Sequence, residues 1–234
     1  MEDLKTMQNN SMVSQKIMVP IENLFKESFE IYKNSFWSFI KLAFIGSIGF
    51  IVVIPFGIAW AVAMLFSGFW FSFPFFLVFF VVLLAVILVC FWIQVSLLFL
   101  IKNRAKKPTL KDSLREGWNH LLPLIWIYFL TGLVSFLGFL LLIIPGIIFT
   151  TWFLFSRYVF VVEGKRGTQA LVASRNLVKG HWWPVFFRLL LIGLLPLVIS
   201  WIPFAGGIIN LFFTMPFSLI YFYLIYENLK AIKS

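Results

Sequence analysis

The sequence predicts an all-α integral membrane protein with six transmembrane helices. Hydrophobic residues make up 62% of the 234 residues, charged residues make up 12%, and the mean hydropathy is +0.99. This composition excludes an ordinary soluble domain. Three stretches contain no Asp, Glu, Lys or Arg: between Lys41 and Lys102, between Glu116 and Arg157, and between Arg188 and Glu227. A bilayer core about 30 Å thick needs about 20 apolar residues per helix, so each stretch is long enough for two crossings.

The N-terminal residues 1–19 are polar and contain no apolar run of their own. They do not have the form of a signal peptide, and we expect a disordered cytoplasmic tail. A single six-span membrane domain, residues 20–234, is expected to follow. The lone Cys90 falls within an apolar span and has no second cysteine with which to form an internal disulfide.

The first surface helix is predicted at Ile21 to Asn34, with apolar and charged residues mostly on opposite faces. Two spans follow, at 37–66 and 75–101, with Pro55-Phe56-Gly57 or Ser67-Gly68 as the turn between them. A second surface helix begins after Pro108, where Thr109 and Asp112 are spaced as a capping box. It leads into spans at 121–144 and 147–162, and we expect a tight turn at Pro145-Gly146 between them.

The third surface helix is predicted within residues 168–180. Its apolar or small residues recur at helical spacing and form one stripe: Ala170, Leu171, Ser174, Leu177 and Val178. Gly180 stands where a helix ends in a left-handed residue, because glycine has no Cβ to clash there. Trp183 then opens the last pair of spans, at 183–202 and 207–226, with Pro203 to Gly207 between them.

These elements predict three repeats, at about 20–107, 108–166 and 167–234, related by a pseudo-threefold axis. Each repeat is a hairpin of two spans preceded by a short amphipathic cytoplasmic helix. Ser28, Ser113 and Ser174 occupy the same register. Six residues later each repeat has Asn34, Asn119 or Gly180, and Asn and Gly are the two residue types that best tolerate a left-handed helix cap. The alternative is that any surface helix entering a membrane ends in Gly or Asn followed by Trp.

The basic residues predict the orientation. The N-terminal tail, residues 102–111, residues 165–179 and the C-terminal Lys230 and Lys233 share one side if the chain crosses six times. The connections on the other side carry no charge. Because positively charged loops stay in the cytoplasm, both termini are expected there.

One pattern in the C-terminal half resembles a known group of proteins. It consists of Pro145-Gly146, Trp152, Glu163-Gly164, and Ala170-Leu171 followed by Ser174, Leu177 and Gly180. The pattern is similar to the membrane domain attached to some bacterial glycerophosphoryl diester phosphodiesterases and to related stand-alone families of unknown function. The resemblance implies six spans in the inner membrane of a bacterium. It implies no activity, because the phosphodiesterase barrel has no counterpart in this sequence.

Five basic residues are candidates for binding a lipid head group or another anion: Arg157, Arg188, Lys41, Arg175 and Lys179. A cation inside a span is costly unless it pairs, faces a wet cavity or extends to the surface. Arg157 lies six residues before Glu163, and its fork suits phosphate or carboxylate; extension to the surface is the competing interpretation. Glu163 itself is expected to pair with Arg157, Arg175 or Arg188.

Composition also ranks the possible functions. The spans contain no carboxylate, and His120 and His181 have no neighbouring ligand cluster, so we expect no enzyme, no metal and no cofactor. The leading interpretation is a non-enzymatic membrane protein that binds anionic phospholipids or membrane protein partners, or a second copy of itself, through a basic cytoplasmic face. Nucleic acid is not an expected partner. The alternative is a channel, or a lipid or small-molecule transporter, with a cavity between the repeats.

Overall fold

The computed structural model describes residues 18–106, 108–203 and 205–233, without the side chains of residue 50 and residues 67–72. The predicted tail therefore lies outside the described residues, apart from Met18 and Val19. The regular elements of the described chain are all helical, and six stretches are long and apolar enough to cross a membrane. Their bounds are Phe36–Phe66, Phe73–Lys102, Leu121–Leu141, Ile143–Glu163, Trp182–Ser200 and Ala205–Lys233. The chain fits a multi-pass membrane protein.

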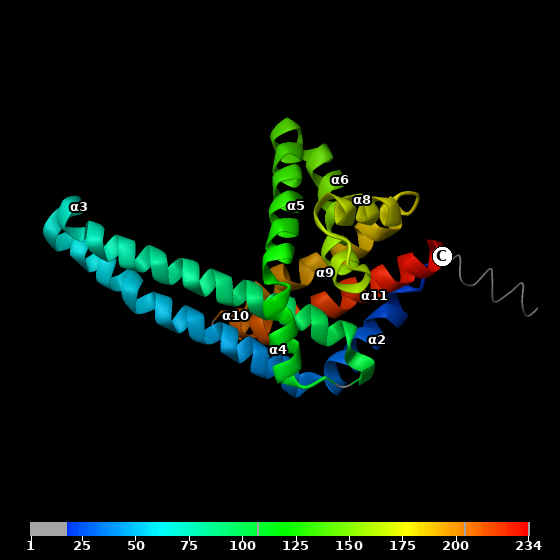
Figure 1. The fold of residues 1–234 in the computed structure, drawn as a ribbon, viewed down its shortest axis with the longest axis horizontal. Helices are drawn as coiled ribbons and strands as arrows, with labels where there is room; N and C mark the ends of the chain where they lie inside the picture. Colours follow the sequence, from blue (N-terminus) through cyan, green and yellow to red (C-terminus); the bar gives the residue numbers. More distant parts are fainter. Residues whose placement is uncertain (1–17, 107, 204, 234) are drawn as a thin grey trace, which may run out of the picture. The chain divides into compact units, whose positions relative to one another are not determined.

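The chain divides into two compact units, and each is described by itself. The first unit contains residues up to Ser35 and residues from Leu122 onward. The second unit is Phe36–Leu121. Figure 1 shows the helices of both units, most of them with the labels used below.

The second unit consists mainly of α3 (Phe36–Lys102), a helix that turns back on itself (Figure 1). Its two halves pack against each other with opposite directions. The ring of Trp60 stacks on Phe79 with 5.8 Å between centroids, and a Cβ on Gly49 would meet Val86 at 2.8 Å. The reversal lies between the apolar stretches that end at Phe66 and begin at Phe73, beyond Pro55.

The helix α4 (Leu110–Asn119) packs against the second half of α3 after the short helix η1 (Arg104–Lys106). The predicted cap is confirmed, because the Thr109 hydroxyl accepts a hydrogen bond from the Asp112 amide at 3.2 Å. Gly117 allows the close approach, since a Cβ there would lie 2.2 Å from the Ser96 hydroxyl. The Trp92 indole also donates to the Leu114 carbonyl at 2.8 Å.

In the first unit, α2 (Ile21–Asn34) has the predicted bounds and packs on α11 (Met215–Lys233). The residues that α2 buries lie four apart, on one face: Leu24, Ser28 and Tyr32. The Tyr32 hydroxyl donates to the Phe212 carbonyl at 3.1 Å, and burial raises the Tyr32 pKa above its ordinary value. A hydrogen bond and an apolar stripe together hold this amphipathic helix in place.

The turn between α5 (Leu121–Leu141) and α6 (Ile143–Phe153) corrects one prediction. The chain reverses at Leu142, which is extended, and Pro145 and Gly146 lie inside the first turn of α6. Proline is accepted there because the first amides of a helix have no intrahelical acceptor. Gly146 serves the contact between the helices, since a Cβ would lie 2.4 Å from the Phe139 ring.

The helix α7 (Ser156–Glu163) ends at Gly164 and is followed by α8 (Gly167–Val178). The predicted stripe of α8 is confirmed at its buried residues: Ala170, Leu171, Ser174 and Val178. Gly180 is left-handed, with φ of 91°, as predicted. The equivalent prediction for Asn34 and Asn119 is wrong. These residues are the last helical residues of α2 and α4, and the caps after them have φ of −112° and −111°.

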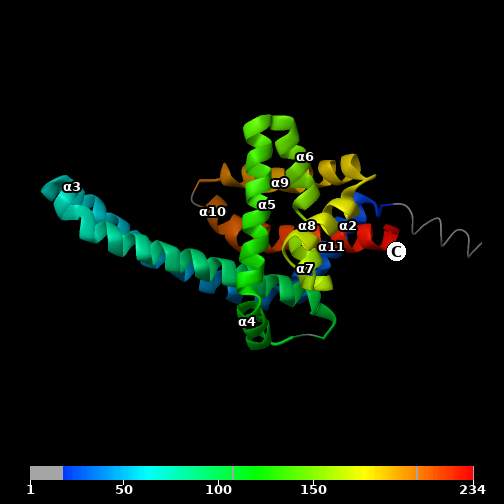
Figure 2. The same ribbon diagram turned by 45° about the horizontal axis from the view of Figure 1, so that its top comes forward.

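The last part of the first unit contains α9 (Trp182–Ser200), α10 (Ala205–Ile209), the π-helix η2 (Asn210–Thr214) and α11. The π-turn precedes Pro216, whose missing amide breaks the regular α-helical bonding. Asn210 bonds to α9 as expected for a polar residue in a span, donating to the Pro196 carbonyl at 3.0 Å. Figure 2 shows the same elements from a second direction.

Candidate functional site

The first candidate site surrounds Glu163, at the end of α7. Its carboxylate accepts a hydrogen bond from the Tyr226 hydroxyl at 2.8 Å and pairs with Lys165 at 2.7 Å and Lys230 at 3.4 Å. The expected pairing with Arg157, Arg175 or Arg188 is therefore wrong. The C-terminal half of α11 lies beside α7 and brings Tyr226 and Lys230 to Glu163. The spacing of residues within one helix cannot predict which helix lies beside α7.

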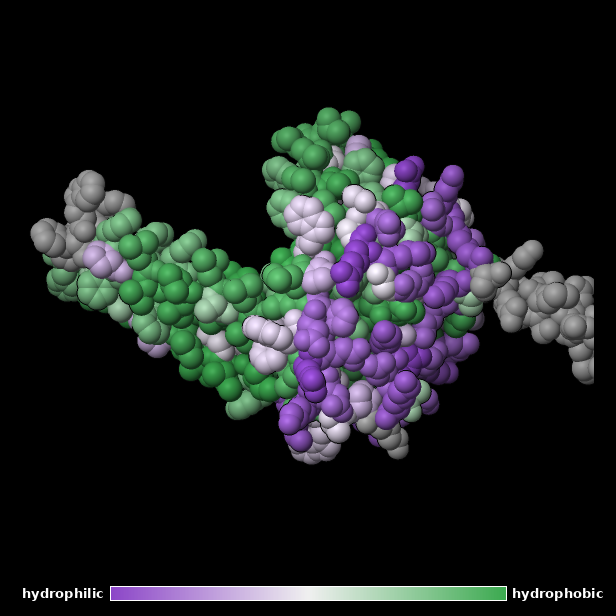
Figure 3. Space-filling view, viewed as in Figure 1, coloured by the Kyte–Doolittle hydropathy of each residue, from purple (hydrophilic) through white to green (hydrophobic). Residues whose placement is uncertain are grey.

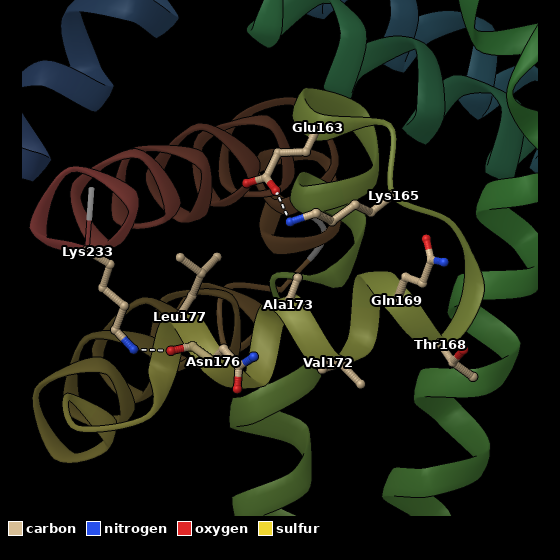
Figure 4. A pocket seen from close by; sticks show the side chains of 9 residues that line it. All are labelled: Glu163, Lys165, Thr168, Gln169, Val172, Ala173, Asn176, Leu177 and Lys233. Carbon is tan, nitrogen blue, oxygen red and sulfur yellow. Dashed lines mark hydrogen bonds and ion pairs between the residues drawn. The ribbon is translucent and has the colours of Figure 1, made fainter.

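A groove of about 570 Å³ lies next to this cluster, along the outer face of α8 (Figure 4). We call it the Glu163 groove. Lys233 closes one end by donating to the carbonyl oxygens of Asn176 and, at 2.8 Å, Lys179. The groove is lined by Glu163, Lys165, Thr168, Gln169, Val172, Ala173, Asn176, Leu177 and Lys233.

Around the Glu163 groove, the ends of α8 and α11 and the α7–α8 loop form a positively charged surface. We call it the charged end. The acidic residues of this surface are Glu163 and Glu227. Its exposed cations are more numerous: Lys165, Arg166, Arg175, Lys179, Lys230 and Lys233. Figure 3 shows hydrophilic side chains over α8 and the end of α11, whereas the far end of α5 is hydrophobic. This surface would attract anions.

A second groove, also of about 570 Å³, lies between α6 and α9 and is almost entirely apolar. We call it the Trp152 groove. Its lining residues are Ile144, Ile147, Ile148, Trp152, Lys179, Gly180, Trp182, Trp183 and Phe186. The Trp182 ring lies parallel to Phe186 at 5.0 Å and meets Trp183 edge-on at 4.8 Å, so the α9 wall is built of contacting rings.

The helix α8 is attached to the Trp152 groove through two adjacent residues. The buried Ser174 hydroxyl donates to the Trp152 carbonyl at 2.6 Å. The Arg175 guanidinium lies 4.7 Å from the centre of the Trp152 ring, within range of a cation–π interaction. Because Lys179 also lines this groove, two of the predicted anion-binding residues lie beside it.

Arg157 is surrounded by aromatic rings rather than by acidic groups. Its guanidinium lies 5.0 Å from the Tyr158 ring, 5.7 Å from Phe222 and 6.0 Å from Tyr128. It also donates to the Tyr128 hydroxyl at 3.3 Å. Among the described residues no carboxylate pairs with it, and its Nε has no hydrogen-bond partner. The aromatic faces stabilise the cation inside the span.

Arg188 is 7% exposed and binds the chain just before α2. Its guanidinium donates to the Val19 carbonyl at 2.8 Å and contacts the Met18 sulfur at 2.8 Å. The Val19 amide in turn donates to Asn228 of α11 at 3.2 Å. Arg188 therefore has a structural partner, and none of its described hydrogen bonds is with Arg175 or Lys179. Lys41 is exposed and belongs to the second unit.

The remaining predicted motif residues have separate tasks. Trp183 is 63% exposed, stacks on Phe187 at 5.9 Å and lines the Trp152 groove, and Gly180 turns the chain beside it. Sequence reasoning missed Tyr226 and Lys233. Lys230, which follows Tyr226 by one helical turn, was the available signal for a charged face on α11.

Comparison with known proteins adds no further assignment. No protein-family model, curated protein or solved structure matches the chain.

Proposed function

We propose that this chain is a non-enzymatic protein of the bacterial inner membrane whose charged end binds anionic phospholipids. The observation that carries the proposal is the set of six exposed cations at the charged end of a chain that has six helices able to cross a membrane. Each cation near an anionic surface contributes about 1 kcal/mol of attraction. The proposal places both termini on the cytoplasmic side, because the cations of the charged end are expected to stay on that side of the membrane. Cysteine labelling from either side of the membrane tests the orientation, and label reaching residue 142 from the cytoplasm would contradict it.

We further propose that the membrane domain is built from three hairpins, each preceded by a surface helix. The support is a shared burial pattern. Ser28, Ser113 and Ser174 are all buried, at 0%, 2% and 0% exposure. Eleven residues later each repeat has a side chain with 0% exposure: Phe39, Leu124 or Val185. Fourteen residues later the chain is buried again, at Leu42, Ile127 or Arg188.

The resemblance to the membrane domain of glycerophosphoryl diester phosphodiesterases remains part of this proposal. Its motif residues occupy structured positions: Gly146 at the contact with α5, Ser174 on Trp152, and Gly180 in a left-handed turn. Such positions restrict the residue type, which is a physical reason for a recurring motif. The proposal would extend to stand-alone members of that group.

Lipid retention tests the proposed function. The protein is placed in nanodiscs that contain equal amounts of phosphatidylglycerol and phosphatidylcholine. It is then released from the nanodiscs, and the lipids that remain bound are identified by native mass spectrometry. We expect the retained lipid to be enriched in phosphatidylglycerol. In the Lys165→Gln/Arg166→Gln variant, this enrichment should fall about fivefold for each cation removed.

The matched control is Lys26→Gln/Lys33→Gln, which removes the same charge from α2, away from the charged end. Equal retention of both lipids by the wild type would overturn the proposal. An equal loss of enrichment in the control would mean that total charge matters, and not this surface.

The second candidate function is a lipid transporter. The observation in its favour is the Trp152 groove, which is open, apolar and bordered by cations, as a path for a lipid would be. An ion channel has less support, since this groove offers an ion few polar groups. Lipid movement between the leaflets of vesicles, measured with and without the protein, separates a transporter from a protein that only binds.

A further inference from the structure

We propose that the Trp152 groove is a specific site for one anionic phospholipid. One acyl chain lies between α6 and α9, and the phosphate lies between Lys179 and Arg175. This inference rests on the proposed function and deepens it, because it assigns the lipid to a single groove.

The groove has the size and lining of a ligand site. Its volume of about 570 Å³ falls within the range of about 300–1,000 Å³ that is usual for small-molecule pockets. Aliphatic side chains of α6 form one wall, and the rings of Trp182, Trp183 and Phe186 form the other. A hydrocarbon chain is the occupant that such walls accept without leaving a polar group unpaired.

The groove opens where a membrane span begins. Lys179 and Gly180 line it immediately before α9 starts at Trp182. Tryptophan is enriched at the membrane interface, where its ring is apolar and its N–H remains polar. Trp182 and Trp183, at the start of α9, therefore place the opening at the level of lipid head groups.

The cations at the opening are held in position by contacts that leave their charges available. The Lys179 carbonyl accepts from Lys233 at 2.8 Å, which fixes the backbone, and its exposed ammonium pairs with no carboxylate of the described chain. The Arg175 guanidinium rests on the Trp152 ring at 4.7 Å.

The charges select the class of lipid. None of the described residues that line the Trp152 groove is acidic, although the Glu163 groove contains a carboxylate. A zwitterionic head group would gain from the cations at its phosphate but would lack an acidic partner for its amine.

The test is photocrosslinking with a lipid that carries a diazirine in its acyl chain. Phosphatidylglycerol and phosphatidylcholine probes are compared in nanodiscs, and crosslinked peptides are mapped by mass spectrometry. We expect phosphatidylglycerol to label residues 144–152 and 182–186 above other lipid-facing segments. Lys179→Ala/Arg175→Ala should lower this preference by about fivefold per cation, while some chain labelling remains.

A steric variant provides the second arm. Ile147→Trp should fill the groove and remove most of the labelling, whereas Leu140→Trp should not, because Leu140 is 73% exposed on α5 outside the groove. If Ile147→Trp does not fold, Ile144→Trp replaces it, since Ile144 lines the groove and is 70% exposed.

The inference would be overturned by labelling that is spread evenly over all spans. It would also be overturned if neither the Lys179→Ala/Arg175→Ala variant nor the Ile147→Trp variant changed the labelling. Equal labelling by the two probes would overturn the head-group assignment. Native mass spectrometry separates the two levels of the proposal. If the wild type retains anionic lipid but the groove variants retain as much, only the groove assignment fails. If the wild type shows no anionic enrichment, the proposed function fails as well.

Discussion

The two grooves beside α8 have the same volume, about 570 Å³, but differ in how they are built. The Glu163 groove is organised by side-chain pairs, in which one carboxylate holds a tyrosine and two lysines. The Trp152 groove is organised by close helix packing and contacting rings. Exposed ion pairs can be exchanged at small cost, whereas packed surfaces tolerate little change in shape. We therefore expect the apolar groove to be the more sensitive to mutation.

The largest effect should come from Gly146→Leu, which tests the packing behind the α6 wall. A side chain there would collide with the Phe139 ring and push α6 away from α5. Overpacking of this kind costs about 1–3 kcal/mol. Thermal unfolding in detergent, followed by tryptophan fluorescence, should show a clear loss of stability.

Gly132→Leu is the matched control, because a Cβ at Gly132 meets nothing within 4 Å. Equal stability of the two variants would show that the contact between α5 and α6 does not support the Trp152 groove, and the comparison would fail.

A smaller effect is expected from Glu163→Gln, which keeps the shape of the side chain and removes its charge. The lysine partners are about half exposed, so the ion pairs contribute only about 1 kcal/mol to the free energy of unfolding. The loss should be greatest at low salt and should shrink near 1 M salt, where the Debye length falls to about 3 Å.

Glu30→Gln in α2 removes the same charge at an exposed position and should change little. The Gly146→Leu loss should depend much less on salt. A salt-independent loss in Glu163→Gln would indicate that the Tyr226 hydrogen bond, and not the ion pairs, organises the Glu163 groove.

The smallest effect is expected from Arg175→Ala. A cation–π contact at an exposed position contributes about 0.5–1 kcal/mol, so stability should fall only slightly. Hydrogen exchange of the α8 amides should increase near Arg175, whereas Arg166→Ala should leave it unchanged. A loss as large as that of Gly146→Leu would contradict the distinction between exposed pairs and packed surfaces.

The sequence predicted features that depend on local pattern. The bounds of α2, the buried stripe of α8, the Thr109 cap and the Gly180 turn all follow from residue spacing within one element. The turn at Leu142 was missed because proline suits both a turn and the first turn of a helix. Only the contact between Gly146 and Phe139 distinguishes the two.

The candidate site was harder to predict, because its partners come from distant parts of the chain. Glu163 meets Tyr226, 63 residues away, and its partner depends on which helix lies beside α7. Arg175 and Lys179 were identified from charge alone, but the apolar groove that gives them a common role needs α6 and α9 side by side. Residue spacing within a helix does not contain this information.

The attachment of residues 18 and 19 has a consequence for how the protein is made. Val19 is held by Arg188 and Asn228, which are 169 and 209 residues further along the chain. The helix α2 is thus synthesised first, but its binding surface is completed only when α9 and α11 have been inserted. Until then its apolar face must rest on the membrane surface or on the insertion machinery. A nascent chain that stops before α9 should therefore expose α2 to protease, and release of the complete chain should protect it.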